Sequence, residues 1–272
     1  MSETPITPFD FESYGVPIRI TGSDQGLIDW GEEVARKALI NNIRLLNGPR
    51  DFASVFELSY EADGKIKLLQ DGRLEGLDAV RDYITKYFNS IIRVAVAENA
   101  ADLMFIHAGA VGWKGRGIVF PGTSFVGKST LVAELVRQGA DYFSDDYAIF
   151  DTQGRLYPFP RILSMRRDEP GFTPYEVTAE ELGGKIGVGP LLVRAICFTE
   201  YTPEAAWTPV QRTPGQGALD LVPFTFSFVN RPEFSLGVLN KITENAIIIS
   251  SQRGSADKFA KTFLNFVDNL PD

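Results

Sequence analysis

The chain has 272 residues, 44% hydrophobic and 23% charged, which is enough to bury the core of one large or two small globular domains. Its 27 Lys and Arg against 35 Asp and Glu give a net charge of −8. This charge argues against a nucleic-acid-binding protein and against a membrane-surface protein, because both need a basic surface. A single cysteine, Cys197, excludes an intramolecular disulfide and a cysteine-based zinc cluster, and a single histidine, His107, excludes a multi-histidine metal site.

The N-terminal residues carry no targeting pattern. The run MSETPITPFDFE is acidic and contains prolines, without a basic segment followed by an apolar one, so we expect no secretory signal. No run of 18 apolar residues occurs, so we expect no transmembrane helix. These features predict a soluble, cytoplasmic protein.

The first hundred residues predict a mixed α+β region. We expect residues 1–14 to be a loose leader. The apolar spacing then predicts a strand, a helix, a β-hairpin turning at Asp63-Gly64 and a second helix, over residues 16–20, 28–46, 56–69 and 76–97.

The remaining residues, 101–272, predict an α/β domain. We expect two strands, a glycine-rich loop, a helix and two further strands, over residues 104–113, 116–121, 122–127, 128–139, 140–144 and 147–151. Residues 155–190 and 201–217 are expected to be loops, residues 192–201 and the end of 243–250 strands, and residues 254–269 an amphipathic helix. The chain is therefore expected to consist of an α+β region over residues 1–100 and an α/β domain over residues 101–272.

The glycine-rich loop matches a phosphate-binding motif. Residues 122–129, GTSFVGKS, fit G-x-x-x-x-G-K-[ST] in full, between a predicted strand and a predicted helix. In such a loop the backbone N–H groups and the helix N-terminus surround phosphate oxygens. Lys128 would neutralise the β- and γ-phosphates and Ser129 would place its hydroxyl on Mg²⁺, so we predict ATP and Mg²⁺ as cofactors. The predicted nucleotide-binding residues are Gly122, Thr123, Ser124, Phe125, Val126, Gly127, Lys128, Ser129 and Thr130. The alternative is a glycine turn that enters an ordinary helix.

Two adjacent carboxylates, Asp145 and Asp146, follow Lys128 by 17 and 18 residues, a spacing that fits one helix, one turn and one strand. In a right-handed βαβ unit the second strand would return beside the first, with its carboxyl end near the phosphate loop. One carboxylate would then hold Mg²⁺ and the other would accept a proton from an attacking hydroxyl. The alternative is an Asp-Asp turn between two strands.

The position of His107 follows from the spacing of the two strands. If Lys114-Gly115 forms a two-residue hairpin turn, Trp113 pairs with Arg116. Counting back along both strands then places His107 opposite Gly122, beside the phosphate loop. The alternative is a hydrogen-bonded histidine in a half-buried strand.

Over about residues 104–151, these features together resemble the catalytic domain of the HPr kinase/phosphorylase family. The resemblance rests on His107, the run GRGIVFPGTSFVGKST and the run YFSDDYAIF, and the early aspartate pair is its more specific part. That family has a P-loop fold related to phosphoenolpyruvate carboxykinase. The resemblance implies ATP-dependent phosphorylation of a serine-type hydroxyl. It also implies Asp145 as the general base, Asp146 as the acidic residue at the Mg²⁺ site and His107 near the transferred phosphate.

The segment after the aspartate pair departs from that family. In place of the arginine-glycine-leucine-glycine signature, residues 160–171 are PRILSMRRDEPG, which argues against phosphorylase activity and against HPr as the substrate. Arg161, Arg166 and Arg167 in this segment are candidates for an internal arginine finger, with a solvated loop charge as the alternative. Arg212 and Arg253 are weaker candidates.

The sequence therefore predicts an HPr-kinase-like paralogue that transfers the γ-phosphoryl group of ATP to a hydroxyl of a peptide, protein or small molecule. Lys128, Asp145 and His107 are its predicted catalytic residues, and Ser129 and Asp146 its predicted metal ligands. One alternative is a nucleotide-binding sensing module without catalysis. A carboxykinase-like enzyme ranks last, because the chain is short and has no second histidine for a metal. No nucleic-acid or membrane partner is expected, and a homo-oligomer is left open.

Overall fold

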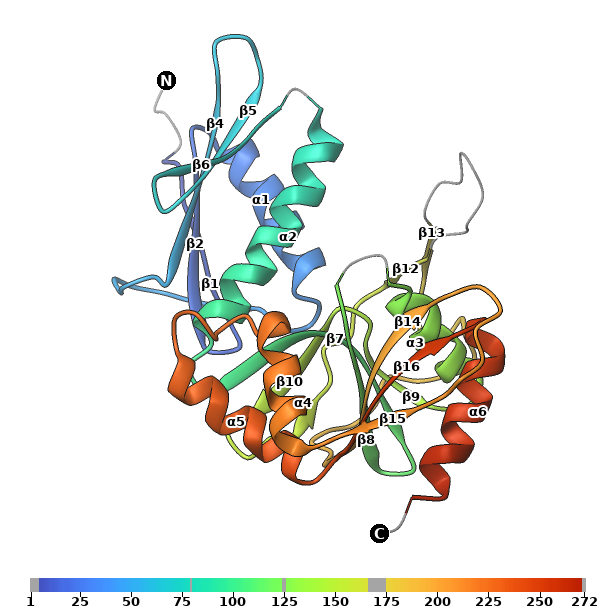
Figure 1. Cartoon of the computed structure of the whole chain (residues 1–272). Coiled ribbons are helices and arrows are strands. Elements are labelled where there is room, and N and C mark those ends of the chain that lie inside the picture. Colours follow the sequence, from blue (N-terminus) through green and yellow to red (C-terminus); the bar gives the residue numbers. More distant parts are fainter. Residues whose placement is uncertain (1–4, 79, 124–125, 166–174, 271–272) are drawn as a thin grey trace. The chain divides into compact units, whose positions relative to one another are not determined.

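The computed structural model describes residues 5–78, 80–123, 126–165 and 175–270. It is a mixed α/β protein whose chain forms two compact units, residues 1–102 and 103–272 (Figure 1). Within the described residues, no helix combines the length and the apolar character that a bilayer crossing needs.

The N-terminal unit is a six-stranded mixed sheet with two helices on one face (Figure 1). The sheet order is β3-β1-β2-β4-β5-β6, and only the β2–β4 pair is parallel. Phe88 of α2 packs against Trp30 of α1 and against Phe56 of the sheet. The elements are β1 (Phe9–Ser13), β2 (Val16–Gly22), α1 (Gln25–Ala38), β3 (Arg44–Leu45), β4 (Ser54–Tyr60), β5 (Ile66–Gln70), β6 (Arg73–Asp78) and α2 (Arg81–Asn99).

The predicted strand over 16–20 and the hairpin at Asp63-Gly64 are confirmed, but three expectations for this unit are wrong. The supposed leader contains β1, whose residues alternate between buried and partly exposed. The helix expected over 28–46 ends at Ala38, because the backbone leaves the helical conformation at Leu39, with φ of −124° and ψ of 55°. Asn41, with φ of 57°, then turns the chain. The helix expected over 76–97 begins only at Arg81, since Leu77 belongs to β6, which pairs with β5.

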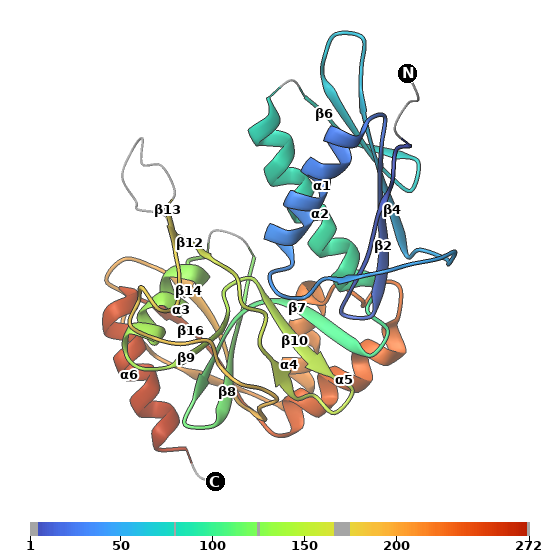
Figure 2. The same cartoon turned by 180° about the vertical axis from the view of Figure 1, so that it is seen from behind.

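The C-terminal unit is a mixed sheet in the order β11-β10-β7-β8-β14-β16-β15, with β9 paired to β7. Strands β8, β14 and β16 are parallel neighbours. Helices α3 and α6 cover one face and α4 and α5 the other (Figure 2). The principal elements are β7 (Leu103–Trp113), β8 (Arg116–Pro121), α3 (Lys128–Arg137), β9 (Asp141–Ser144), β10 (Tyr147–Asp151), β11 (Leu156–Tyr157), β14 (Val193–Tyr201), β15 (Val210–Arg212), α4 (Pro214–Leu221), α5 (Pro232–Glu244), β16 (Ile247–Arg253) and α6 (Ala256–Asp268).

Successive side chains of the parallel strands point to opposite faces of the sheet, and both faces are buried under helices. The unit therefore has three layers, with the sheet between two layers of helices. Ile118 and Phe120 of β8 belong to the core under α3 and α6, whereas Val119 between them belongs to the core under α4 and α5. Such two-faced burial is typical of parallel strands covered by helices. The helix expected over 254–269 is confirmed as α6.

Two regions expected to be loops contain regular structure. Residues 201–217 include β15 and the start of α4, where Pro214 and a capping box between Thr213 and Gln216 begin the helix. Residues 155–190 include β11 and the small sheet of β12 (Leu163–Met165) and β13 (Tyr175–Val177). Helix α5 was not expected at all. These elements are short or lack a strong apolar period, so the pattern of the sequence gives little sign of them.

Candidate phosphate-binding site and its acidic pair

The hairpin of β7 and β8 places the histidine beside the phosphate loop. Trp113 pairs with Arg116 across the turn at Lys114-Gly115, where both residues have positive φ. The register continues to Ala108 and Pro121, and the N–H of Gly122 donates to the carbonyl of His107 at 3.3 Å. The predicted turn and the predicted position of His107 opposite Gly122 are both confirmed.

The glycine loop leads directly into α3. Gly127 has φ of 84° and is the N-cap of the helix, and its carbonyl accepts the first helical hydrogen bond, from Leu131. The Lys128 side chain is buried, and its Nζ donates to the carbonyls of Gly122 at 2.8 Å and Thr123 at 2.7 Å. Burial lowers the pKa of Lys128, although the nearby aspartates oppose this shift. Two predicted loop residues, Ser124 and Phe125, lie outside the described residues. Val126 precedes Gly127 within the motif, and Thr130 follows the motif in the first turn of α3.

The acidic pair lies in a break within one long strand. Strands β9 and β10 both pair with β7 in antiparallel register, β9 with its second half and β10 with its first half. The expectation that β9 returns beside β8 is wrong, because β9 pairs in antiparallel register with β7, which is also the hairpin partner of β8. The carboxyl end of β9 nevertheless reaches the start of α3, as expected, since Ser129 Oγ donates to Asp145 Oδ2 at 2.7 Å.

Asp145 is the deeply buried member of the pair. Its side chain is 4% exposed, and its second oxygen accepts a 3.0 Å hydrogen bond from the hydroxyl of Tyr142. Burial raises the pKa of Asp145, which the Arg161 charge and these hydrogen bonds only partly oppose. The sequence analysis missed Tyr142, although its place three residues before Asp145 on a strand was a signal.

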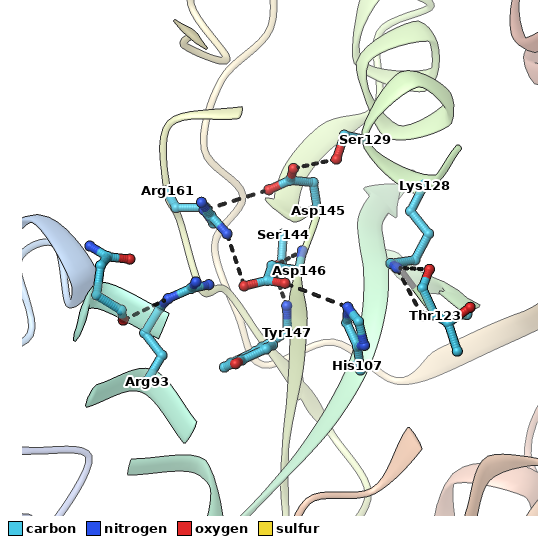
Figure 3. Close-up of polar contacts among 12 residues, drawn as sticks. Arg93, His107, Thr123, Lys128, Ser129, Ser144, Asp145, Asp146, Tyr147 and Arg161 are labelled. Carbon is cyan, nitrogen blue, oxygen red and sulfur yellow. Dashed lines mark hydrogen bonds and ion pairs between the residues drawn. The ribbon is translucent and has the colours of Figure 1, made fainter. Parts of the chain in front are cut away.

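Asp146 is the more open member, with its side chain 19% exposed. One of its oxygens lies 3.6 Å from His107 Nε2, and the other accepts a 2.8 Å hydrogen bond from Arg161 Nη1. Figure 3 shows Arg161 pointing at both carboxylates, with its Nε 4.0 Å from Asp145. The structure thus brings His107, Ser129, both aspartates and Arg161 together.

The other arginine candidates lie in different places. Arg253, at the end of β16, donates from Nη2 to the carbonyl of Gly127 at 3.0 Å, so it contacts the phosphate loop. Arg212 lies on β15 near Ser250 and Asp220, away from these contacts. Arg166 and Arg167 lie outside the described residues. The sequence analysis ranked Arg253 and Arg212 equally as weaker candidates; the place of Arg253 at the carboxyl end of β16 is the signal that could have separated them.

The described residues contain no group of three or more histidine, cysteine or acidic side chains that would enclose a metal ion. A magnesium ion does not need one, because it keeps several waters and takes ligands from phosphates. Ser129 at the start of α3, Asp145 against its hydroxyl and Asp146 next in the chain could hold such a partly coordinated ion. No protein-family model matches the chain, and no curated protein matches it either.

Proposed function

We propose that this chain is an ATP-dependent kinase with a P-loop fold like that of HPr kinase and phosphoenolpyruvate carboxykinase. It transfers the γ-phosphoryl group to a serine-type hydroxyl of a peptide, protein or small molecule. The observation that carries the proposal is the 2.7 Å contact of Ser129 with Asp145, which joins the glycine loop to the acidic pair. Phosphoryl transfer depends mainly on positioning and on charge stabilisation, and this cluster has groups for both.

The phosphates are assigned to the loop amides, the N-terminus of α3 and Lys128. The two carbonyls that now accept from Lys128 belong to the loop itself, so Lys128 already lies within the loop that would surround an anion. Bound Mg²⁺ supplies neutralisation of the phosphate charge. Ser129 and Asp145 are the residues that would hold it, because a cation between them would offset the cost of burying the Asp145 charge.

Asp146 is the better-placed carboxylate for the acceptor hydroxyl. It is more exposed than Asp145 and lies against His107, while Arg161 fixes the direction of its carboxylate. The geometry therefore favours an exchange of the roles expected from the resemblance, with Asp145 on the metal side and Asp146 on the acceptor side. Because the transition state is loose, orienting the hydroxyl matters more than a strongly basic carboxylate.

A second candidate function is a nucleotide sensor without transfer. One observation favours it: Arg161 already neutralises the acidic pair, as in a purely structural ion-pair cluster. Such a protein would bind ATP through Lys128 and consume none of it.

The deciding experiment uses γ-labelled ATP, Mg²⁺ and a clarified lysate of the source organism, with wild type beside Lys128→Ala. Lys128-dependent label in protein or peptide, or in a small molecule, supports a kinase and identifies the acceptor class. ATP binding with no Lys128-dependent label would overturn the kinase and favour the sensor. The division of labour is tested separately: Asp145→Asn should raise the Mg²⁺ concentration needed for half-maximal rate, and Asp146→Asn should lower the rate at saturating Mg²⁺.

A further inference from the structure

A cavity of about 240 Å³ opens between the turn that follows β14 and the first turns of α6. Glu204 and Trp207 line it from the turn, and Ser255, Lys258 and Phe259 from the start of α6. None of these residues belongs to the phosphate site. We propose that this cavity binds the purine base of the nucleotide, an inference that rests on the proposed function.

The cavity lies at the edge of the sheet where the parallel strands have their carboxyl ends. Strands β8, β14 and β16 are parallel neighbours, so their carboxyl ends lie at one edge of the sheet. The phosphate loop follows β8, and the cavity is formed by the segments that follow β14 and β16. Ligands of open α/β sheets bind outside that edge.

Arg253 joins the cavity to the phosphate loop. Its Nη2 donates to the carbonyl of Gly127 in the loop, and its Nη1 donates at 3.2 Å to the carbonyl of Gly254 in the cavity wall. A Cβ on Gly254 would lie 3.1 Å from the carbonyl oxygen of Ala205, so glycine lets the two walls approach. One buried side chain thus touches both places, as expected when a single ligand spans them.

The lining suits a purine. The ring of Trp207 packs edge-on against Phe259 with centroids 5.7 Å apart, which provides aromatic surface for a flat base. The carboxylate of Glu204 in the cavity lining can accept a hydrogen bond from an exocyclic amino group of such a base.

Glu204 is held in a conformation that its side chain type disfavours. Its φ is 58°, in the turn closed by the hydrogen bond from the Ala205 N–H to the Thr202 carbonyl. A left-handed conformation is unfavourable for residues other than glycine, and such strain gathers at ligand sites. Glu204→Gly therefore removes the carboxylate without cost to the backbone.

The test measures the affinity of ATP and of inorganic tripolyphosphate, each with Mg²⁺, by calorimetry. Thr262 lines the cavity from the exposed side of α6, so Thr262→Trp fills it, and Asn265→Trp on the same helix outside the cavity is the matched control. Thr262→Trp should weaken ATP binding about tenfold or more, the value of one base-stacking contact, and leave tripolyphosphate binding unchanged. Asn265→Trp should change neither.

Glu204→Gly should also weaken ATP and spare tripolyphosphate, with a melting temperature at least as high as that of wild type. Equal loss of both ligands in Thr262→Trp, or unchanged ATP affinity in both cavity variants, would overturn the base site. Neither result depends on phosphoryl transfer. A chain that loses ATP selectively in these variants but labels no acceptor would keep the base site and lose the kinase.

Discussion

The hydroxyl of Ser129 lies 2.7 Å from Oδ2 of Asp145, although Ser129 belongs to α3 and Asp145 to the break between β9 and β10. This contact ties the phosphate loop to the acidic pair. With Tyr142 on its other oxygen, Asp145 has a hydroxyl donor on each side and only 4% of its side chain exposed. The arrangement keeps a carboxylate buried at the proposed Mg²⁺ site, and a buried carboxylate costs stability.

Replacement of Asp145 by asparagine should stabilise the nucleotide-free protein at neutral pH. Because the folded-state pKa of Asp145 is raised by burial, the folded protein holds this proton more readily than the unfolded chain. Wild-type stability therefore falls as pH rises from the unfolded pKa through the folded one. Urea unfolding at a series of pH values above the unfolded pKa should show an advantage of Asp145→Asn that shrinks as pH is lowered. A variant less stable than wild type at every pH would contradict this account.

Asp151→Asn is the matched control with the opposite sign. Burial raises the pKa of Asp151, but hydrogen bonds from the Arg155 backbone and side chain outweigh it, so the pKa is lowered. Asp151 therefore adds stability above its unfolded pKa and loses it as pH falls. Asp151→Asn should destabilise the protein at neutral pH, and by less in acid.

Replacement of Lys128 by methionine should weaken nucleotide binding strongly and leave the fold intact. Among the described residues, the Nζ of Lys128 donates to the loop carbonyls of Gly122 and Thr123, and methionine fills the same buried space without the charge. Calorimetry should show ATP affinity reduced by roughly tenfold to a hundredfold, the effect of losing one charge-assisted hydrogen bond of about 1.5–3 kcal/mol. Circular dichroism should be unchanged. Lys128→Arg keeps the charge and should retain more affinity than Lys128→Met; equal affinities would mean that the charge is not used.

Much of the phosphate site could be predicted from local pattern. The motif at residues 122–129, the hairpin turn at Lys114-Gly115 and the resulting place of His107 depend on short-range spacing, and the structure agrees with them. The place of β9 could not be predicted, because strand order depends on which edge of β7 is open. The contact of Arg253 with the loop could not be predicted either, because its partner Gly127 is 126 residues away in sequence.

Arg161 should act as a positioning residue for the acidic pair. Its guanidinium reaches Asp146 at 2.8 Å and approaches Asp145, a two-way geometry that lysine does not reproduce. Once the acceptor is identified, kcat can be measured. Arg161→Lys should lower it by roughly tenfold to a hundredfold, the cost of misplacing the carboxylates, with little change in KM for ATP. Arg155→Lys, in an exposed pair with Asp151, is the control and should retain full rate. A normal kcat in Arg161→Lys would show that Arg161 does not position the acidic pair for catalysis.

Two glycines with positive φ, Gly127 and Gly139, allow backbone strain to be separated from the contact of Arg253 with Gly127. Gly127 has φ of +84°, and a Cβ there would lie 2.6 Å from Nη2 of Arg253. Gly139, just after α3, has φ of +98°, but its Cβ would meet nothing closer than Trp113 at 3.8 Å. Both alanine variants should therefore lose about 1–2 kcal/mol of unfolding free energy from strain.

Gly127→Ala should lose more than Gly139→Ala, because the buried Arg253 must leave the Gly127 carbonyl. Only Gly127→Ala should also weaken tripolyphosphate binding, since the loop amides around it share that backbone. Urea unfolding and calorimetry on the two variants measure both effects. If their stabilities and phosphate affinities are equal, Arg253 does not support the loop.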